Sequence, residues 1–352
     1  MKISRIEWID SFRGGLILLI VVGHVIGGAE AAGHINGKFW SGINRIIYMF
    51  HVPAFFVLTG FLWKTTEVNA HLLSELKRFA AKKFMRLMVP YFVSGIASVI
   101  IYCFVIEKGF ESLGAKCLSL LHGGGWGGAF KANFVLWFLP VMFSVTVLYK
   151  AIDMLIEWRR TWWAHLLFAL GSLYLHRYCV YRLGVDVFPL GFAFAMRYLG
   201  YVVLGRLAAR IIEASTTTMR ERSSATIGII VFAILAFFDR EVCVALVGDW
   251  MSWMVMVVVG VLMSLSFMLM LKPLDCGMFR IAGKHSLGIM LMHKFVVVSL
   301  ESNLMKPFMM WNFCNGAFGV IVVSVMAAAI ALFASICICR LCPILLGVPT
   351  GR

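Results

Sequence analysis

Ten long apolar runs, separated by short segments rich in basic residues, constrain this chain more than any other feature. They cover residues 12–28, 44–63, 87–106, 133–152, 162–176, 188–211, 225–239, 250–271, 279–300 and 316–339. A helix needs about 20 predominantly apolar residues to cross a bilayer. We therefore expect an all-α fold, a polytopic transmembrane bundle of about ten helices that occupies residues 1–352 as a single domain, with no appended soluble domain.

The composition excludes an ordinary water-soluble domain. Hydrophobic residues make up 61% of the chain and charged residues only 14%, whereas charged residues form about 25% of typical soluble domains. A transmembrane β-barrel would instead show segments of about 10 residues with alternating polarity. The runs here are continuous, so the lipid bilayer is the expected partner of a helical bundle.

The distribution of basic residues predicts the orientation. With the N-terminus inside, and with residues near the ends of runs counted in the adjoining segment, 21 of the 32 Lys and Arg fall in cytoplasmic segments and 9 in outer segments, while Arg197 and Lys294 lie within runs. This asymmetry indicates two cytoplasmic termini. We expect the chain to lie in a bacterial-type inner membrane. It also explains the net charge of +15 without a nucleic-acid partner. The fifth run is short, and its loss would invert the topology after it.

Two local patterns have alternative interpretations. Lys2 and Arg5 before an apolar stretch resemble a signal peptide, but His24 interrupts that stretch and argues against cleavage. Cys337, Cys339 and Cys342 could form a metal site, but a fourth ligand is missing nearby. Helix-end cysteines are the favoured interpretation, acylation of one of them stays open, and no metal is predicted.

Ionisable residues inside the runs are the best candidates for function. A charged group at the bilayer centre costs at least about 2.5–3.5 kcal/mol, so such residues are candidates by default, even though each could be a hydrogen-bonded core residue. The histidines and Arg197 belong to different runs and are expected at similar depths in the outer half of the membrane. The set comprises Arg13, His24, His51, Arg197, His293 and Lys294.

Arg13 and His24 form the most informative pair. They are 11 residues apart, which in a helix is only about 20° past three full turns and about 16 Å along the axis. A cation at the cytoplasmic mouth and an acid–base group deeper on the same face would suit a long donor with phosphates at one end and a reactive tail. Acyl-coenzyme A has that shape. Gly23 and Gly27 predict close helix packing beside His24.

Six stretches of the sequence, taken in order, resemble the membrane-bound acyltransferase-3 family of O-acyltransferases, and most closely its fucose 4-O-acetylase-like group. Thr59 replaces the usual Ser and His285 the usual Asn, and we expect no appended extracytoplasmic esterase-like domain. The stretches are Trp8–Gly14 with Val21–His24, Phe50–Phe61, Arg86–Tyr91, Leu136–Pro140, Gly283–Ile289 leading to His293, and Cys342–Gly347.

The resemblance implies transfer of an acyl group, expected to be acetyl, from cytoplasmic acyl-CoA to a hydroxyl of a saccharide or cell-surface glycan precursor. His24 would be catalytic, as a general base or a transient acyl carrier, and His51 would orient His24 or stabilise the oxyanion. Arg13 would bind donor phosphates with Arg86, and Asp10 would orient Arg13. The acceptor would contact Trp137, Arg197 and His293, and no cofactor besides the donor is implied.

Two other functional classes stay open at this point. A transporter of a saccharide or small metabolite would also contain buried histidines and arginines, but the second half of the chain has no counterpart of the His24 and His51 segments. A partner-binding subunit would not require Arg13 and His24 on one helix face. Neither the oligomeric state nor the identity of the acceptor follows from the sequence.

Overall fold

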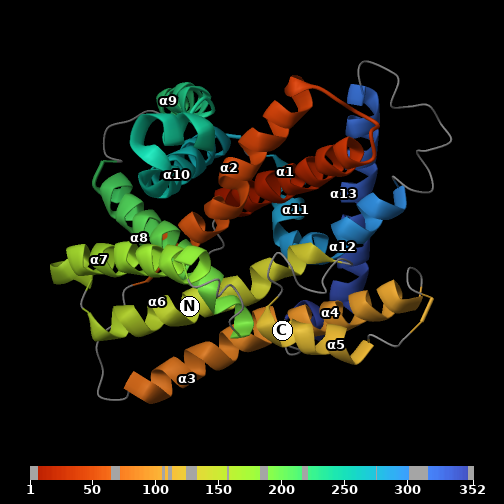
Figure 1. The fold of residues 1–352 in the computed structure, drawn as a ribbon, viewed down its shortest axis with the longest axis horizontal. Coiled ribbons are helices and arrows are strands. Elements are labelled where there is room, and N and C mark those ends of the chain that lie inside the picture. Colours follow the sequence, from red (N-terminus) through yellow and green to blue (C-terminus); the bar gives the residue numbers. More distant parts are fainter. Residues whose placement is uncertain are drawn as a thin grey trace. The chain divides into compact units, whose positions relative to one another are not determined.

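Every predicted apolar run coincides with helix in a computed structural model of the chain. The structure describes residues 7–64, 72–104, 108–109, 113–123, 133–156, 158–182, 189–215, 221–274, 276–300 and 316–347, and none of these residues forms a strand. The all-α prediction is therefore confirmed, and the chain is a multi-pass membrane protein (Figure 1).

The chain divides into two compact units, each made of segments that are distant in sequence. Unit 1 contains residues 1–57 and 210–337, and unit 2 contains residues 58–209 and 338–352. The helices of unit 1 are α1 (Glu7–Ala31), most of α2 (Lys38–Phe61), α9 (Glu221–Leu235), α10 (Arg240–Leu271), α11 (Gly277–Lys284), α12 (Ser286–Ser299) and most of α13 (Ala317–Leu341).

Unit 2 contains the remaining helices and several tight helical turns. Its α-helices are α3 (Leu72–Lys83), α4 (Val89–Tyr102), α5 (Leu113–Ser119), α6 (Phe138–Leu155), α7 (Trp158–Arg177) and α8 (Phe192–Ser215). Its π-helices are η1 (Phe84–Met88) and η5 (Tyr178–Arg182). Its 3-10 turns are η3 (Leu120–His122), η4 (Phe134–Trp137), η6 (Pro189–Gly191) and η9 (Pro343–Leu346).

Fewer helices than the predicted ten are both long and apolar enough to span a membrane. Seven helices in the described part of the chain meet this condition, and the count is eight if α11 and α12 form one broken span. The two predicted runs that do not meet it lie in α7 and α9. Helix α7 carries Arg177 and two histidines among its apolar residues, and α9 has only 15 residues.

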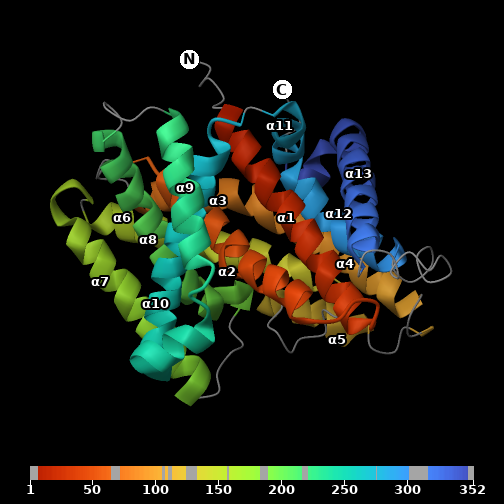
Figure 2. The same cartoon turned by 90° about the horizontal axis from the view of Figure 1, so that it is seen from above.

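Helices α1 and α11 approach each other until their backbones touch (Figure 2). A Cβ atom built on Gly14 would lie 1.9 Å from the carbonyl oxygen of Phe279, and one on Gly283 would lie 1.8 Å from that of Asp10. After α11 the chain bends by 85° into α12. Gly14 and Gly283 belong to two of the six family-like stretches, and together they permit one close contact between helices.

Two ion pairs show which helix ends lie together in unit 1. Arg280 donates to Glu7 at 2.5 Å, so α11 lies beside the start of α1. Arg45 pairs with Asp239, which also caps α10 by accepting a hydrogen bond from the Val242 amide at 2.8 Å. In the topology predicted from the basic residues, the two members of each pair lie on the same side of the membrane.

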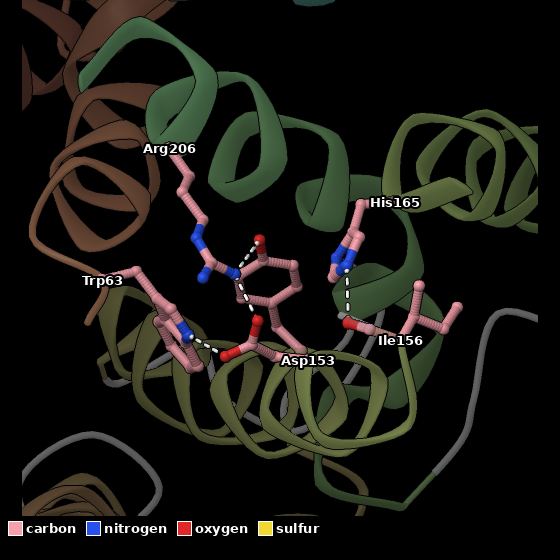
Figure 3. Close-up of polar contacts among 6 residues, drawn as sticks. Trp63, Asp153, Ile156, His165 and Arg206 are labelled. Atoms are coloured by element: carbon pink, nitrogen blue, oxygen red, sulfur yellow. Dashed lines mark hydrogen bonds and ion pairs between the residues drawn. The ribbon is translucent and has the colours of Figure 1, made fainter. Parts of the chain in front are cut away.

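Unit 2 is built around a buried carboxylate, Asp153 (Figure 3). One of its oxygens accepts a hydrogen bond from Arg206 at 2.5 Å and the other from the Trp63 indole at 3.0 Å. Arg206 also donates to the Tyr149 hydroxyl at 3.1 Å. Arg206 of α8 is only 4% exposed, and its charge is balanced by Asp153 of α6.

Further contacts within unit 2 involve α3 and the C-terminal segment. Lys150 donates to Glu75 of α3 at 2.7 Å. A Cβ on Gly60 would lie 1.9 Å from the Val202 carbonyl oxygen, and one on Gly347, whose φ is +64°, would lie 2.5 Å from that of Arg86. The Arg86–Tyr91 and Cys342–Gly347 stretches, far apart in sequence, thus meet in space.

The α1–α11 contact predicts a steric effect that depends on position within one helix. Gly283→Ala should destabilise the protein by about 1–3 kcal/mol, because the new methyl group has no room beside the Asp10 backbone. Gly277→Ala, also in α11, meets no atom within 4 Å and is the matched control. Thermal unfolding of detergent-purified protein measures both, and equal melting temperatures for the two variants would contradict the packing argument.

The buried carboxylate predicts that the same substitution has different effects at two ion pairs. Asp153→Asn leaves the Arg206 guanidinium buried without its counter-charge, which should cost about 3–5 kcal/mol. Asp249→Asn breaks an exposed pair with Arg240 and should cost about 0–1 kcal/mol. Melting curves of the two variants in detergent compare these costs. An Asp153→Asn variant with the wild-type melting temperature would show that Asp153 is not needed to balance the Arg206 charge.

Candidate active site

Helix α1 is unbroken from Glu7 to Ala31, so the helical geometry assumed for Arg13 and His24 applies. Both side chains project from nearly the same face of one helix and are separated by about three turns. Arg13 is partly exposed, whereas His24 is only 7% exposed. A cation near one end of the helix and a buried imidazole toward its other end are therefore features of the fold.

His24 lies against His293 of α12. The two imidazole rings stack with their centroids 5.2 Å apart and their planes 29° apart, and His293 is completely buried. The structure therefore brings together two of the histidines that the sequence places in different runs. Two buried imidazoles in contact form a site rich in nitrogen lone pairs within an apolar surrounding.

Tyr48 of α2 connects His24 to the third predicted histidine, His51. The Tyr48 hydroxyl lies 3.0 Å from Nδ1 of His24, and its ring packs edge-on against His51 with centroids 4.8 Å apart. Sequence reasoning missed Tyr48. The signal that could have found it is its position three residues before His51, which places both side chains on neighbouring positions of one helix face.

Backbone carbonyls determine the tautomers of two of these histidines. Nδ1 of His51 lies 2.7 Å from the Ile47 carbonyl oxygen, and Nδ1 of His293 lies 3.0 Å and 2.9 Å from those of Ile289 and Met290. A carbonyl only accepts, so in each neutral ring Nδ1 carries the proton and Nε2 presents a lone pair. Nε2 of His293 is buried and has no hydrogen-bond partner within the described ranges.

Gly23 lets α2 approach α1 beside His24, as the sequence predicted. A Cβ on Gly23 would lie 3.2 Å from both the Tyr48 ring and the Ile47 side chain. The neighbouring Gly27 is less crowded, because its Cβ would lie 3.5 Å from the Asn44 side chain. The glycine at position 23 therefore leaves the space in which Tyr48 reaches His24.

Asp10, which was predicted to orient Arg13, is 2% exposed and lies at the α1–α11 contact. Its carbonyl oxygen is the atom that Gly283 approaches, so its place is fixed by the close packing of the two helices. Asp10 thus belongs to the same rigid part of unit 1 as the first turns of α1, where Arg13 also lies.

Three predicted site residues belong to unit 2, which is described by itself. Arg86 lies in the π-helix η1, is exposed, and contacts Gly347 through its backbone. Trp137 packs against Tyr198, with ring centroids 5.8 Å apart, and Arg197 places its guanidinium carbon 5.8 Å from the same Tyr198 ring. The structure therefore brings Trp137 and Arg197 together around one aromatic side chain that the sequence did not single out.

Comparisons with known proteins identify the family to which the chain is similar. The protein-family model described as "Acyltransferase domain" matches residues 6–340 and so covers both units. A curated relative, the nodulation protein NolL of Sinorhizobium fredii, is 26% identical over 240 residues, which are 65% of this chain and 56% of the relative. The chain thus matches little more than half the length of that relative.

No solved structure matches the chain. The family model nevertheless covers nearly the whole sequence, including the α1 helix with Arg13 and His24 and the α12 helix with His293. The chain is a member of this acyltransferase family.

Proposed function

We propose that this protein is an acyl-CoA-dependent O-acyltransferase of a bacterial-type inner membrane. It transfers an acyl group, expected to be acetyl, to a hydroxyl of a saccharide or cell-surface glycan precursor. The observation that carries the proposal is the position of His24, a buried imidazole on the helix face of Arg13, in a chain that belongs to an acyltransferase family. In this proposal both termini lie in the cytoplasm.

The donor end of the site is assigned to cationic side chains. Arg13, at the first turns of α1 and partly exposed, contacts phosphates of coenzyme A, and Arg86 of η1 assists. Guanidinium groups suit this role because their planar donors bind phosphate oxygens in pairs. Asp10, one turn before Arg13, orients the Arg13 guanidinium.

The chemical step requires one base and no metal. Nε2 of His24 takes the proton from the acceptor hydroxyl while the hydroxyl oxygen attacks the thioester carbonyl carbon. The carbon–sulfur bond then breaks, and the leaving thiolate takes the proton from the His24 imidazolium to give free coenzyme A. In the alternative route His24 carries the acyl group transiently on Nε2 before the acceptor attacks.

The remaining assigned residues position the reactants. His51 and His293 present Nε2 lone pairs, and a lone pair accepts hydrogen bonds from hydroxyl groups such as those of a saccharide. We therefore assign His293 to the acceptor and give His51 the role of orienting the His24 region. Trp137 and Arg197 of unit 2, joined through Tyr198, are also assigned to acceptor binding, where an aromatic face suits a sugar ring.

His24→Ala should abolish most of the acyl transfer. Loss of a general base lowers rates by about 10²–10⁴-fold, and acceptor-dependent release of free coenzyme A from acetyl-CoA by purified protein measures it. His165→Ala removes another buried histidine, whose Nε2 contacts the Ile156 carbonyl oxygen, and should keep its turnover per folded molecule. A folded His24→Ala variant with full activity would remove His24 from the mechanism.

Arg13→Ala should weaken donor binding rather than the chemical step. A charge-assisted hydrogen bond contributes about 1.5–3 kcal/mol, so the affinity for coenzyme A should fall about 10–100-fold in a calorimetric titration. Arg280→Ala removes a cation from the same end of unit 1, where it pairs with Glu7, and should leave the affinity near wild type. An equal loss in both variants would indicate a general charge effect instead of a phosphate contact at Arg13.

A further inference from the structure

We infer that Tyr48 is a positioning residue that holds the His24 imidazole in the orientation that acyl transfer requires and accepts a hydrogen bond from Nδ1–H in the reactive tautomer. The inference rests on the proposed function and adds a residue that the sequence pattern did not single out. Its basis is the 3.0 Å contact between the Tyr48 hydroxyl and Nδ1 of His24, supported by the close packing of α2 against α1.

The partner of Nδ1 separates His24 from the two other histidines of unit 1. Nδ1 of His51 and of His293 each face carbonyl oxygens, which only accept hydrogen bonds and so fix one tautomer. Nδ1 of His24 faces a phenol, which both donates and accepts. The Tyr48 contact is therefore compatible with either neutral tautomer of His24 and with its imidazolium, whereas the carbonyls require a proton on Nδ1. The proposed step uses the neutral tautomer that carries its proton on Nδ1.

This property matches the proton movements of the proposed step. In the resting enzyme Nδ1–H of His24 donates to the Tyr48 oxygen, so Nε2 is the unprotonated nitrogen that takes the proton of the acceptor hydroxyl. When Nε2 takes the hydroxyl proton, the imidazolium keeps the same Nδ1–H···O bond. That bond becomes charge-assisted and therefore stronger. When the leaving thiolate takes the Nε2 proton, the resting state returns.

Tyr48 lies at the edge of the buried histidine cluster, and its ring is fixed by contacts with two of the histidines. The residue is 44% exposed whereas His24 is 7% exposed, so Tyr48 stands between a buried ring and an accessible side of α2. Its ring is held edge-on by both His24, with centroids 5.9 Å apart, and His51. These contacts give the hydroxyl a fixed direction, and His51 thereby orients His24 through Tyr48.

Gly23 supplies the space for this arrangement. A Cβ atom built on Gly23 would lie only 3.2 Å from the Tyr48 ring, which is tighter than ordinary van der Waals contact. A methyl group at position 23 would therefore push the Tyr48 ring away from α1. The ring would then move away from His24, which follows Gly23 in that helix. At position 27 an added Cβ would be 3.5 Å from Asn44 and would not reach Tyr48.

The decisive variant is Tyr48→Phe, which keeps the ring and removes only the hydroxyl. Because the lost bond is strengthened in the transition state, we expect kcat to fall about 10–100-fold, the range of a charge-assisted hydrogen bond. The KM for donor and acceptor should change less than threefold. Equal melting temperatures of Tyr48→Phe and wild type in detergent confirm that the fold is kept.

A spectroscopic measurement separates positioning from a general packing effect. Nitrogen-15 NMR of ring-labelled histidine, with His24 assigned by the signals that vanish in His24→Ala, reports which ring nitrogen carries the proton. In the wild type Nε2 of His24 should resonate as an unprotonated nitrogen. In Tyr48→Phe the Nδ1 and Nε2 shifts should move toward each other as the two tautomers mix, while the other histidine signals stay in place.

Gly23→Ala and Gly27→Ala form a second, independent pair. Gly23→Ala should lower kcat and shift the His24 nitrogen signals in the same direction as Tyr48→Phe, whereas Gly27→Ala should match wild type in both. Wild-type kcat or unchanged His24 signals in Tyr48→Phe would overturn the role of Tyr48, and so would a loss confined to KM. If His24→Ala is fully active, the proposed mechanism itself fails, so the two failures are distinguishable.

Discussion

The backbone contact between α1 and α11 is the constraint on which the rest of unit 1 depends. Gly14 and Gly283 allow a separation that any side chain would prevent, and the Arg280–Glu7 pair fastens the same end. In a bilayer, helices gain little from burying apolar surface against one another, so van der Waals contact and polar bonds must provide the association. Fixing the start of α1 in this way also fixes the direction in which Arg13 and His24 project.

The polar groups of the two units are neutralised in different ways. In unit 2 the Arg206 charge is balanced by Asp153, whose other oxygen accepts a hydrogen bond from Trp63, and Arg206 also donates to the Tyr149 hydroxyl. In unit 1 the polar cluster consists of imidazoles, which are neutral bases, and a phenol, which both donates and accepts hydrogen bonds. A satisfied ion pair gives rigidity, whereas neutral imidazoles can accept and release protons.

The sequence predicted what depends on periodicity and failed where a contact depends on the packing of distant segments. The helix positions followed from apolar runs, and the relation between Arg13 and His24 followed from the 3.6-residue turn within one helix. The pairing of Asp153 with Arg206 joins residues 53 positions apart, and no periodic pattern reveals it. The contact of Tyr48 with His24 requires α2 to cross α1 at Gly23, and the crossing point is a tertiary property.

The family-like stretches therefore combine two kinds of residue. The proposed mechanism assigns the chemistry to His24, His51 and His293, whereas Gly14, Gly60, Gly283 and Gly347 occupy places where a Cβ would collide with a neighbouring backbone. Such glycines act on function through position, because a shift of about 1 Å at a reacting group is enough to lower a rate strongly. The pairing of Gly23 with His24 joins both kinds in adjacent positions: one residue provides the base, and its neighbour provides the space for the side chain that holds it.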